Sequence, residues 1–206
     1  MNTLSAIRAD TYRHCGKFGW LTFLKSAVFS RTFRVVVTLR LCQAAANSRG
    51  AIRLILPLLK VMHRTTTHRA AMDFPWNTSV GPGLMLTHGW GLVINSGAQI
   101  GKNVTLYHGV TLGQRDRISR DGIRSTVFPV LEDEVWVGPH VLIVGGVVVG
   151  RGSRIAGGAV VRESVPPYSV VMGNPASIVK SNCTADVMNR PPVEPAGLPS
   201  EPHALA

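Results

Sequence analysis

The sequence predicts a parallel β-solenoid that follows an N-terminal α-helical region. Aliphatic residues recur at every sixth position through the middle of the chain, and a glycine or asparagine often comes next. The recurring residues form two blocks: Ile94, Ile100, Leu106 and Leu112, then Leu131, Val137, Ile143, Val149, Ile155 and Val161. A six-residue period suits short strands joined by tight turns, with three hexapeptides in each coil. A valine-rich sandwich with accidental spacing would not explain two blocks that each keep this period.

Composition divides the chain into three regions. Residues 1–70 are basic and carry apolar residues at helical spacing, so we expect helices there. Residues 71–180 hold the repeat, and a polar insertion at 114–130 interrupts it; an insertion of this length is expected to project from one corner as a loop. Residues 181–206 are rich in proline and poor in residues that could pack, which is typical of a disordered tail.

The positive charge is concentrated in the helical region. The chain has 22 basic residues, 11 acidic residues and a net charge of +11. Residues 1–72 contain all of this excess, because their only acidic residue is Asp10. Such a region could attract anionic lipid, nucleic acid or an acidic substrate, or could simply be a solvated helical face. Because no basic patch is interleaved with aromatic residues, we expect no nucleic-acid partner.

Cysteine content and hydropathy indicate the compartment. Cys15, Cys42 and Cys183 are too few and too far apart for a disulfide framework or a zinc site, so we expect no metal and a reducing environment. The N-terminus lacks the pattern of a secretory signal. The apolar stretches are shorter than the ~18 residues that span a bilayer. We therefore expect a cytoplasmic protein, with peripheral association at the inner membrane face as a further option.

Four segments carry a family resemblance, and they comprise residues 72–75, 83–94, 107–113 and 165–176. With this combination the chain resembles the hexapeptide-repeat acyltransferases and, within them, the serine acetyltransferase-like branch. The resemblance implies a left-handed parallel β-helix, a homotrimer, and acetyl-CoA bound in a cleft between neighbouring solenoids. It covers about residues 70–180.

By this resemblance, His88 is the general base that takes the proton of an acceptor hydroxyl. Asp73 matches the acid that orients this histidine, although it could instead cap a turn. The family often has a second acid just before the histidine, where this chain has Thr87. His108 could line the same cleft or lie on the surface. Trp90 could stack on a sugar ring or pack in the ordinary way.

The resemblance also suggests how acetyl-CoA is bound. Gly113, Pro139 and Gly157 match positions where small residues and backbone amides line the groove. Arg154 and Lys180 could approach the coenzyme phosphates. Pro139 has no backbone N–H to offer, which puts that contact in doubt.

The acceptor is the point at which the sequence departs from the family. Serine acetyltransferases have an Arg-His pair before the proline that follows the loop, and this chain has Val127 and Phe128 before Pro129. The charged partner of the serine carboxylate is therefore missing, unless Arg124 or another loop arginine replaces it. The helical region is also shorter than in those enzymes.

These departures favour a sugar hydroxyl of a capsule or exopolysaccharide precursor as the acceptor. The basic helices, through Arg34, Arg40 and Arg53, would then hold the enzyme near an anionic membrane. Two alternatives remain open: serine O-acetylation for cysteine biosynthesis, and a catalytically inactive solenoid that acts as a scaffold.

Overall fold

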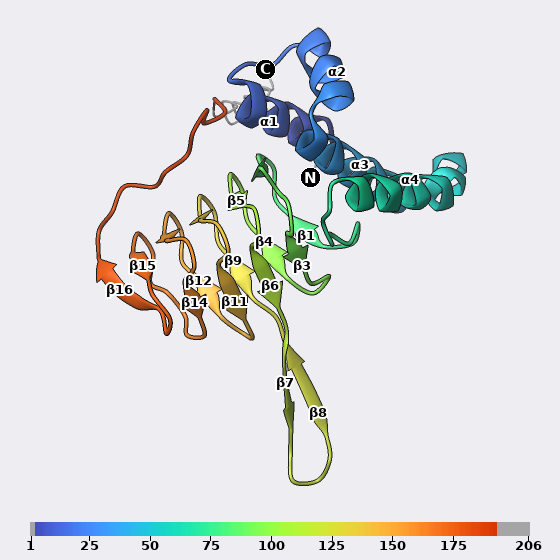
Figure 1. Ribbon diagram of the computed structural model, residues 1–206. Coiled ribbons are helices and arrows are strands. Elements are labelled where there is room, and N and C mark those ends of the chain that lie inside the picture. Colours follow the sequence, from blue (N-terminus) through green and yellow to red (C-terminus); the bar gives the residue numbers. More distant parts are fainter. Residues whose placement is uncertain (1–2, 193–206) are drawn as a thin grey trace, which may run out of the picture.

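The structure is a computed structural model that describes residues 3–192, in which helices cover one end of a stack of β-coils (Figure 1). The helical elements are α1 (Thr3–Cys15), α2 (Trp20–Phe29), α3 (Arg31–Asn47), the 3-10 helix η1 (Ala51–Ile55) and α4 (Leu56–Arg69). The Ser30 hydroxyl caps α3 by accepting a hydrogen bond from the Phe33 N–H at 3.3 Å. Pro57 lies in the first turn of α4, where its missing N–H costs nothing.

The strands form three parallel sheets, and each coil contributes one strand to each sheet in turn. The first sheet contains β1 (Ser79–Val80), β4 (Gln99–Ile100), β9 (Val130–Leu131) and β12 (Val148–Val149). The second contains β2 (Met85–Thr87), β5 (Thr105–Tyr107), β10 (Trp136–Val137), β13 (Arg154–Ile155), β15 (Val170–Met172) and the antiparallel β16 (Ser177–Lys180). The third contains β3 (Val93–Ile94), β6 (Thr111–Gly113), β11 (Leu142–Val144) and β14 (Val160–Val161).

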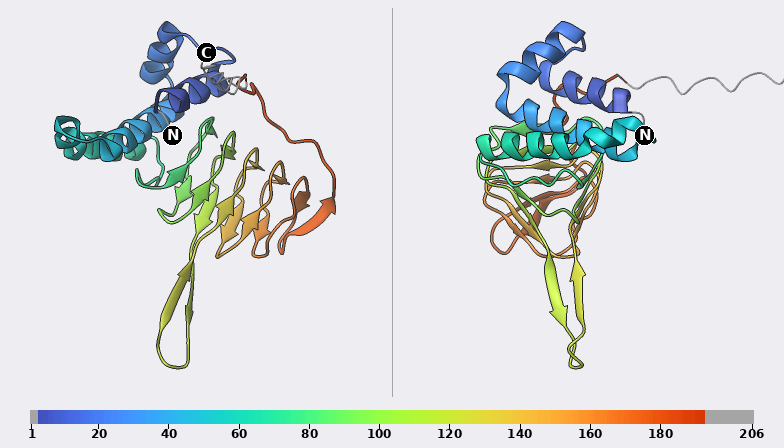
Figure 2. Two further views of the ribbon diagram at one scale, coloured as in Figure 1. Left: turned by 180° about the vertical axis from the view of Figure 1, so that it is seen from behind. Right: turned by 90° about the vertical axis from the view of Figure 1, so that its right-hand side faces the viewer.

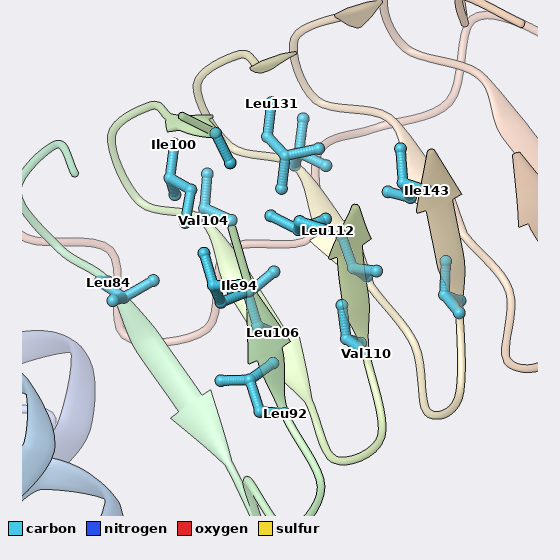
Figure 3. Close-up of a cluster of buried hydrophobic side chains, with 14 of the residues drawn as sticks. Leu84, Leu92, Ile94, Ile100, Val104, Leu106, Val110, Leu112, Leu131 and Ile143 are labelled. Carbon is cyan, nitrogen blue, oxygen red and sulfur yellow. The ribbon is translucent and has the colours of Figure 1, made fainter. Parts of the chain in front are cut away.

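The six-residue repeat supplies the core of this stack. Each of its ten aliphatic positions is at most 3% exposed, and the side chains meet between the three sheets (Figure 3). Parallel pairing places them in register, as in Leu106 with Val137 and Leu112 with Ile143. The prediction of stacked coils from the repeat is therefore confirmed.

The insertion at 114–130 is an ordered β-hairpin rather than an irregular loop. Its strands are β7 (Arg115–Ile118) and β8 (Arg124–Val127), which pair antiparallel and project away from the coils (Figure 1). Coils on either side of the hairpin still pair directly, because β4 bonds to β9 across it. An insertion of this kind leaves the stacking of the core unchanged.

The segment after the last strand differs from the expected disordered tail. From β16 the chain runs back along the coils to the helices (Figure 1). The Cys183 N–H donates to the Tyr168 carbonyl at 2.7 Å, and the Asn189 side chain donates to the Arg13 carbonyl at 3.1 Å. Residues 181–192 are thus held by hydrogen bonds that composition does not reveal, and residues 193–206 lie outside the described part of the chain.

Buried charged groups fasten the helices to the first coil. Asp10 and Arg40 form an ion pair at 2.8 Å with both side chains 2% exposed. Arg40 also donates to the carbonyls of Val80 and Gly81, at 2.8 and 2.6 Å. Arg40 is therefore unavailable to a membrane, which corrects that part of the expectation.

Arg13 makes a second fastening next to this ion pair. Its guanidinium donates to the Gly83 carbonyl at 3.1 Å and to the Thr105 hydroxyl at 2.6 Å. Burial lowers the pKa of Arg13 to about 10.

None of the helices within residues 3–192 has the length and apolar character needed to cross a bilayer.

Candidate active site

One corner of the coils collects most of the candidate residues. It comprises residues 88–92, 108–110, 138–141 and 156–159, which link the second sheet to the third, and we call it the histidine corner. Backbone hydrogen bonds stack its layers: Gly109 N–H to the Trp90 carbonyl, His140 N–H to the His108 carbonyl, and Gly158 N–H to the Pro139 carbonyl, at 2.7, 2.9 and 2.8 Å. Residues far apart in the sequence therefore form one line along the edge of the solenoid.

The first layer of this corner is enlarged. Leu86 pairs with Leu106, and Ile94 pairs with Leu112. Ile94 lies eight positions after Leu86 in the first coil, whereas Leu112 lies only six positions after Leu106 in the second coil. The two extra residues are accommodated by left-handed backbone at His88, Gly89 and Gly91, whose φ angles are 62°, 66° and 66°. His88 is exposed on this bulge, and its backbone conformation is one that few non-glycine residues adopt.

Three imidazole rings lie in succession along the corner. The His88 and His108 ring centroids are 5.9 Å apart, and those of His108 and His140 are 4.9 Å apart with the rings perpendicular. The His108 Nδ1 is buried without a hydrogen-bond partner. The structure therefore places His108 beside His88, in line with the interpretation that both histidines line the same cleft. His140 was not singled out from the sequence, although the repeat register places residues 138–141 next to 108–110.

A residue from the helices also reaches the enlarged turn. The Arg31 guanidinium donates to the backbone carbonyls of Ala70 and His88, and its Cζ lies 3.6 Å from the Trp90 ring centroid. Arg31 thus fixes the backbone that carries His88, a role for which we found no signal in the sequence. Trp90 is partly covered by this cation, so its face is already occupied by a cation–π contact.

Asp73 lies on the neighbouring strand edge rather than at the corner. Its N–H donates to the Leu92 carbonyl and its carbonyl accepts from the Ile94 N–H, both at 2.8 Å. The Asp73 side chain lines a groove of about 490 Å³ together with residues of α4. Among residues 3–192, no hydrogen bond joins its carboxylate to the His88 ring, so the proposed pairing stays a prediction.

The groove beside Asp73 is positively charged. Its other lining residues are Lys60, His63, Arg64, Thr67, His68, Met72, Phe74, Pro75 and Trp76. The Lys60 ammonium lies 4.5 Å from the Trp76 ring centroid. His63 is buried between the Thr38 hydroxyl and the Phe74 carbonyl, at 2.8 and 2.7 Å, and burial lowers its pKa. Asp73 is the carboxylate that faces these cations within the groove.

The residues expected to hold acetyl-CoA fall into two groups. Pro139 and Gly157 are neighbours on the histidine corner, since a Cβ on Gly157 would lie 3.2 Å from the Pro139 carbonyl oxygen. Gly113 ends β6, where the chain enters the hairpin. Arg154 lies on β13, 3.3 Å from the Asp186 carboxylate, and Lys180 is exposed at the end of β16. The structure thus brings only the first two to the line that contains His88.

Arg124 lies away from the histidine corner in the same chain. It belongs to the hairpin, which links the third sheet to the first, and it pairs with Asp116 at 2.5 Å. Arg115, at the base of the hairpin, has a buried Nε with no hydrogen-bond partner in the described part of the chain. No group of three or more metal-binding side chains that could hold an ion occurs within residues 3–192.

Sequence comparisons match part of the coils to a recognised repeat family. Residues 128–163 match the model for the bacterial transferase hexapeptide (six repeats). The chain is 36% identical over 125 residues to a serine acetyltransferase of Bacillus subtilis, which covers 61% of this chain and 55% of that protein. It is 38% identical over 101 residues to serine acetyltransferase 2 of Arabidopsis thaliana, which covers 49% of this chain and 30% of that one. The chain thus spans about half or less of the length of these curated relatives.

Solved structures show the same architecture over nearly all of the chain. A serine acetyltransferase of Vibrio cholerae superposes with a TM-score of 0.73 at 22% identity, covering 91% of this chain and 69% of that one, which shows the fold. A Brucella abortus serine acetyltransferase in complex with coenzyme A gives 0.66 at 27% identity, covering 88% and 68%. A soybean serine acetyltransferase complexed with serine gives 0.65 at 26%, covering 86% and 68%. The likeness implies a left-handed β-helix with N-terminal helices.

These comparisons contradict the expected sugar acceptor. The relatives are named serine acetyltransferase, and none of those reported above is a polysaccharide enzyme. The expectation rested on the absence of the Arg-His pair. The absence of a group that binds serine does not show which other acceptor would bind. Residues 128–163 thus carry the hexapeptide repeat, and over part of its length the chain is similar in sequence to proteins named serine acetyltransferase.

Proposed function

We propose that this protein is a serine O-acetyltransferase, which moves an acetyl group from acetyl-CoA to the hydroxyl of L-serine. The observation that carries the proposal is the exposed imidazole of His88 on an enlarged, glycine-flanked corner of a hexapeptide-repeat stack. The names of the relatives supply the substrate class. The chain spans only part of those relatives, so the activity needs a direct test.

His88 acts as the general base in this proposal. Imidazole accepts and releases protons near neutral pH, and within the described residues no hydrogen bond ties up either nitrogen of this ring. The ring takes the serine hydroxyl proton as that oxygen attacks the thioester carbonyl. The tetrahedral intermediate then collapses, the C–S bond breaks, and the imidazolium returns the proton to the thiolate of coenzyme A. Acetylserine and free coenzyme A leave in equal amounts.

Asp73 would orient this ring if the turn moves when substrates bind. Hydrogen bonds at active sites often tighten only in the substrate complex. Its backbone hydrogen bonds to Leu92 and Ile94, just after the enlarged turn, and its exposure support that role. We assign Asp73 as a positioning residue for His88.

Acetyl-CoA would lie along the histidine corner, beside the neighbouring residues Pro139 and Gly157. Gly113 would border it at the end of β6, and Arg154 and Lys180 would serve the phosphates. The hairpin lies on another corner of the same chain, so an acceptor that contacts both the hairpin and His88 requires a second copy. We therefore propose that the acceptor site lies between copies, in the homotrimer that the family resemblance implies.

Arg115 is the better candidate for the serine carboxylate. Arg124 is already paired with Asp116, whereas the buried Arg115 Nε has no partner in the described part of the chain. Arg115 also borders a cavity of about 720 Å³ between the hairpin base and the last coils. We expect Arg115→Ala to raise the KM for L-serine with little change in that for acetyl-CoA, and Arg124→Ala to change neither by more than about twofold.

Steady-state kinetics test the proposal. The wild-type chain should consume acetyl-CoA in the presence of L-serine, and His88→Ala should lower kcat by about 10²–10⁴-fold because proton transfer is lost. His203→Ala, which makes the same chemical change outside the described residues, is the matched control and should keep full turnover. A folded wild-type chain that gives no turnover with L-serine would reject the proposal and leave the scaffold alternative.

A further inference from the structure

Helix α2 has its apolar face turned to the solvent. Its outward positions are Trp20, Leu21, Leu24, Val28 and Phe29, which are between 55% and 82% exposed. The half-buried positions of α2 are Thr22, Phe23, Ser26 and Ala27, and the Phe23 ring contacts Phe33 of α3. Figures 1 and 2 show α2 on the outer side of the helices, away from the coils. A surface helix normally leaves polar side chains on its outer face, so an outer face made of large apolar side chains indicates a surface that another body covers.

The segment from η1 into α4 repeats this arrangement. Its exposed apolar residues are Ile52, Leu54, Ile55, Leu58 and Val61, between 48% and 81% exposed. The same helix turns His63 and Thr67 inward, where they are 3% and 5% exposed. Two separate helical elements therefore present apolar residues outward, and α4 also buries polar ones.

The charge around these faces has a single sign. Asp10 is the one acidic residue in 1–72, and it is buried against Arg40. The exposed basic residues of the helices and of the loops between them are Arg8, Lys17, Lys25, Arg49, Arg53, Lys60, Arg64 and Arg69. The outer surface of the described helices thus combines apolar side chains with cations and offers no carboxylate.

We propose that α2, together with η1 and the start of α4, docks on the surface of an anionic lipid bilayer. Apolar side chains enter the boundary between headgroups and acyl chains, while lysine and arginine contact anionic headgroups; Trp20 is a residue type that prefers this boundary. A second copy of the same face fits poorly, because the pairing would bring cations against cations. The proposal does not depend on the acetyltransferase activity. Docking would hold the first coil, which carries His88, at the membrane.

Vesicle co-sedimentation tests this docking. We expect the wild-type chain to bind phosphatidylcholine vesicles that contain about 30% phosphatidylglycerol far better than pure phosphatidylcholine, and to release as salt rises from about 0.05 to about 0.5 M. Leu21→Gln, Leu24→Gln and Phe29→Gln combined should weaken binding at least about tenfold. Lys17→Glu and Lys25→Glu should each weaken it about fivefold or more.

Ile118→Gln with Ile123→Gln is the matched control. These residues are 64% and 68% exposed on the hairpin, away from the helices, so this change should leave vesicle binding unaltered. The proposal fails if the wild-type chain ignores anionic vesicles at low salt, or if the α2 triple variant binds them as well as the wild type. It also fails if sedimentation velocity shows that the triple variant splits a lipid-free assembly, because the face would then be an interface between copies.

Discussion

The coils and the helices of this protein differ in how regularly they bury their side chains. In the coils, each repeat position points an aliphatic side chain inward and is at most 3% exposed. In the helices, charged and polar side chains such as Asp10, Arg13 and His63 are buried, while Leu21 and Leu54 are more than 80% exposed. A repeat places the same side chain in the same environment in each coil, whereas the helices meet the coils through contacts made once.

The buried charges of the helices have a structural purpose. The first coil would otherwise end in unpaired backbone N–H and carbonyl groups, as any sheet edge does. Arg40 donates to the carbonyls of Val80 and Gly81, and Asp10 accepts from the N–H groups of Gly83 and Leu84 at 2.7 and 2.9 Å. The helices therefore complete the hydrogen bonding of the solenoid end with side chains rather than with another strand.

The largest effect on stability is expected at the buried ion pair of Asp10 and Arg40. Asp10→Ala should lower the free energy of unfolding by about 3–5 kcal/mol, because it leaves the Arg40 charge and two backbone N–H groups unpaired. Asp116→Ala removes the partner of Arg124 in the exposed hairpin pair and should cost at most about 1 kcal/mol. Urea unfolding of both variants measures the difference. Equal losses would contradict the role assigned to the buried pair.

A core substitution tests the other half of the comparison. Ile143→Ala empties a fully buried repeat position and should cost about 2–5 kcal/mol. Leu21→Ala, on the outward face of α2, should change the free energy of unfolding by less than about 0.5 kcal/mol. Chemical denaturation monitored by circular dichroism compares the two. A large loss at Leu21 in the isolated chain would mean that this face is already covered.

The histidine corner can be probed through a glycine. Gly109 has a φ of 67°, and a Cβ there would lie 2.3 Å from the His140 Nδ1. Gly109→Ala should cost about 1–3 kcal/mol through backbone strain and displacement of that ring. Gly122, at the hairpin tip, has a similar φ of 77°, and a Cβ there would have no atom within 4 Å. Gly122→Ala therefore measures the backbone strain alone. Equal decreases in the melting temperatures of the two variants would show that displacing the His140 ring adds no destabilisation.

The pH dependence of stability sharpens the picture of the helices. Burial lowers the pKa of His63, although its hydrogen bond to the Phe74 carbonyl acts in the opposite direction. The unfolded chain therefore takes up this proton first as the pH falls below the ordinary histidine value of about 6.5. Stability should be full above that value and decline below it, by at most about 1.4 kcal/mol per pH unit from this group. The free energy of unfolding of His63→Gln, measured between about pH 8 and about pH 5, should decline less steeply than that of the wild-type chain. An identical slope would show that His63 does not contribute to the pH dependence of stability.

The sequence was informative where the structure repeats and uninformative where it does not. The six-residue period predicted the buried positions, and the break in that period predicted a projecting insertion. Helical spacing predicted helices, but not that Asp10, Arg13 and Arg40 would be buried, because their burial depends on backbone N–H and carbonyl groups of a distant coil. For the same reason Arg31, which holds the His88 turn, carries no local signal.

The candidate site shows the same division. His88 and His108 could be placed together because their spacing is close to one coil. His140 follows an insertion, so its place on the corner depends on pairing across the hairpin. The acceptor was the weakest inference, since Val127 and Phe128 indicate only which side chains are missing.

The central claim is that the histidine corner transfers acetyl groups to serine, and product analysis tests it most directly. The wild-type chain, incubated with acetyl-CoA and L-serine, should yield O-acetylserine and free coenzyme A in equal amounts by mass spectrometry. His88→Ala, folded by circular dichroism, should yield neither above the background without enzyme. Acetylserine formed as fast by His88→Ala as by the wild-type chain, or none formed by a folded wild-type chain, would contradict the account.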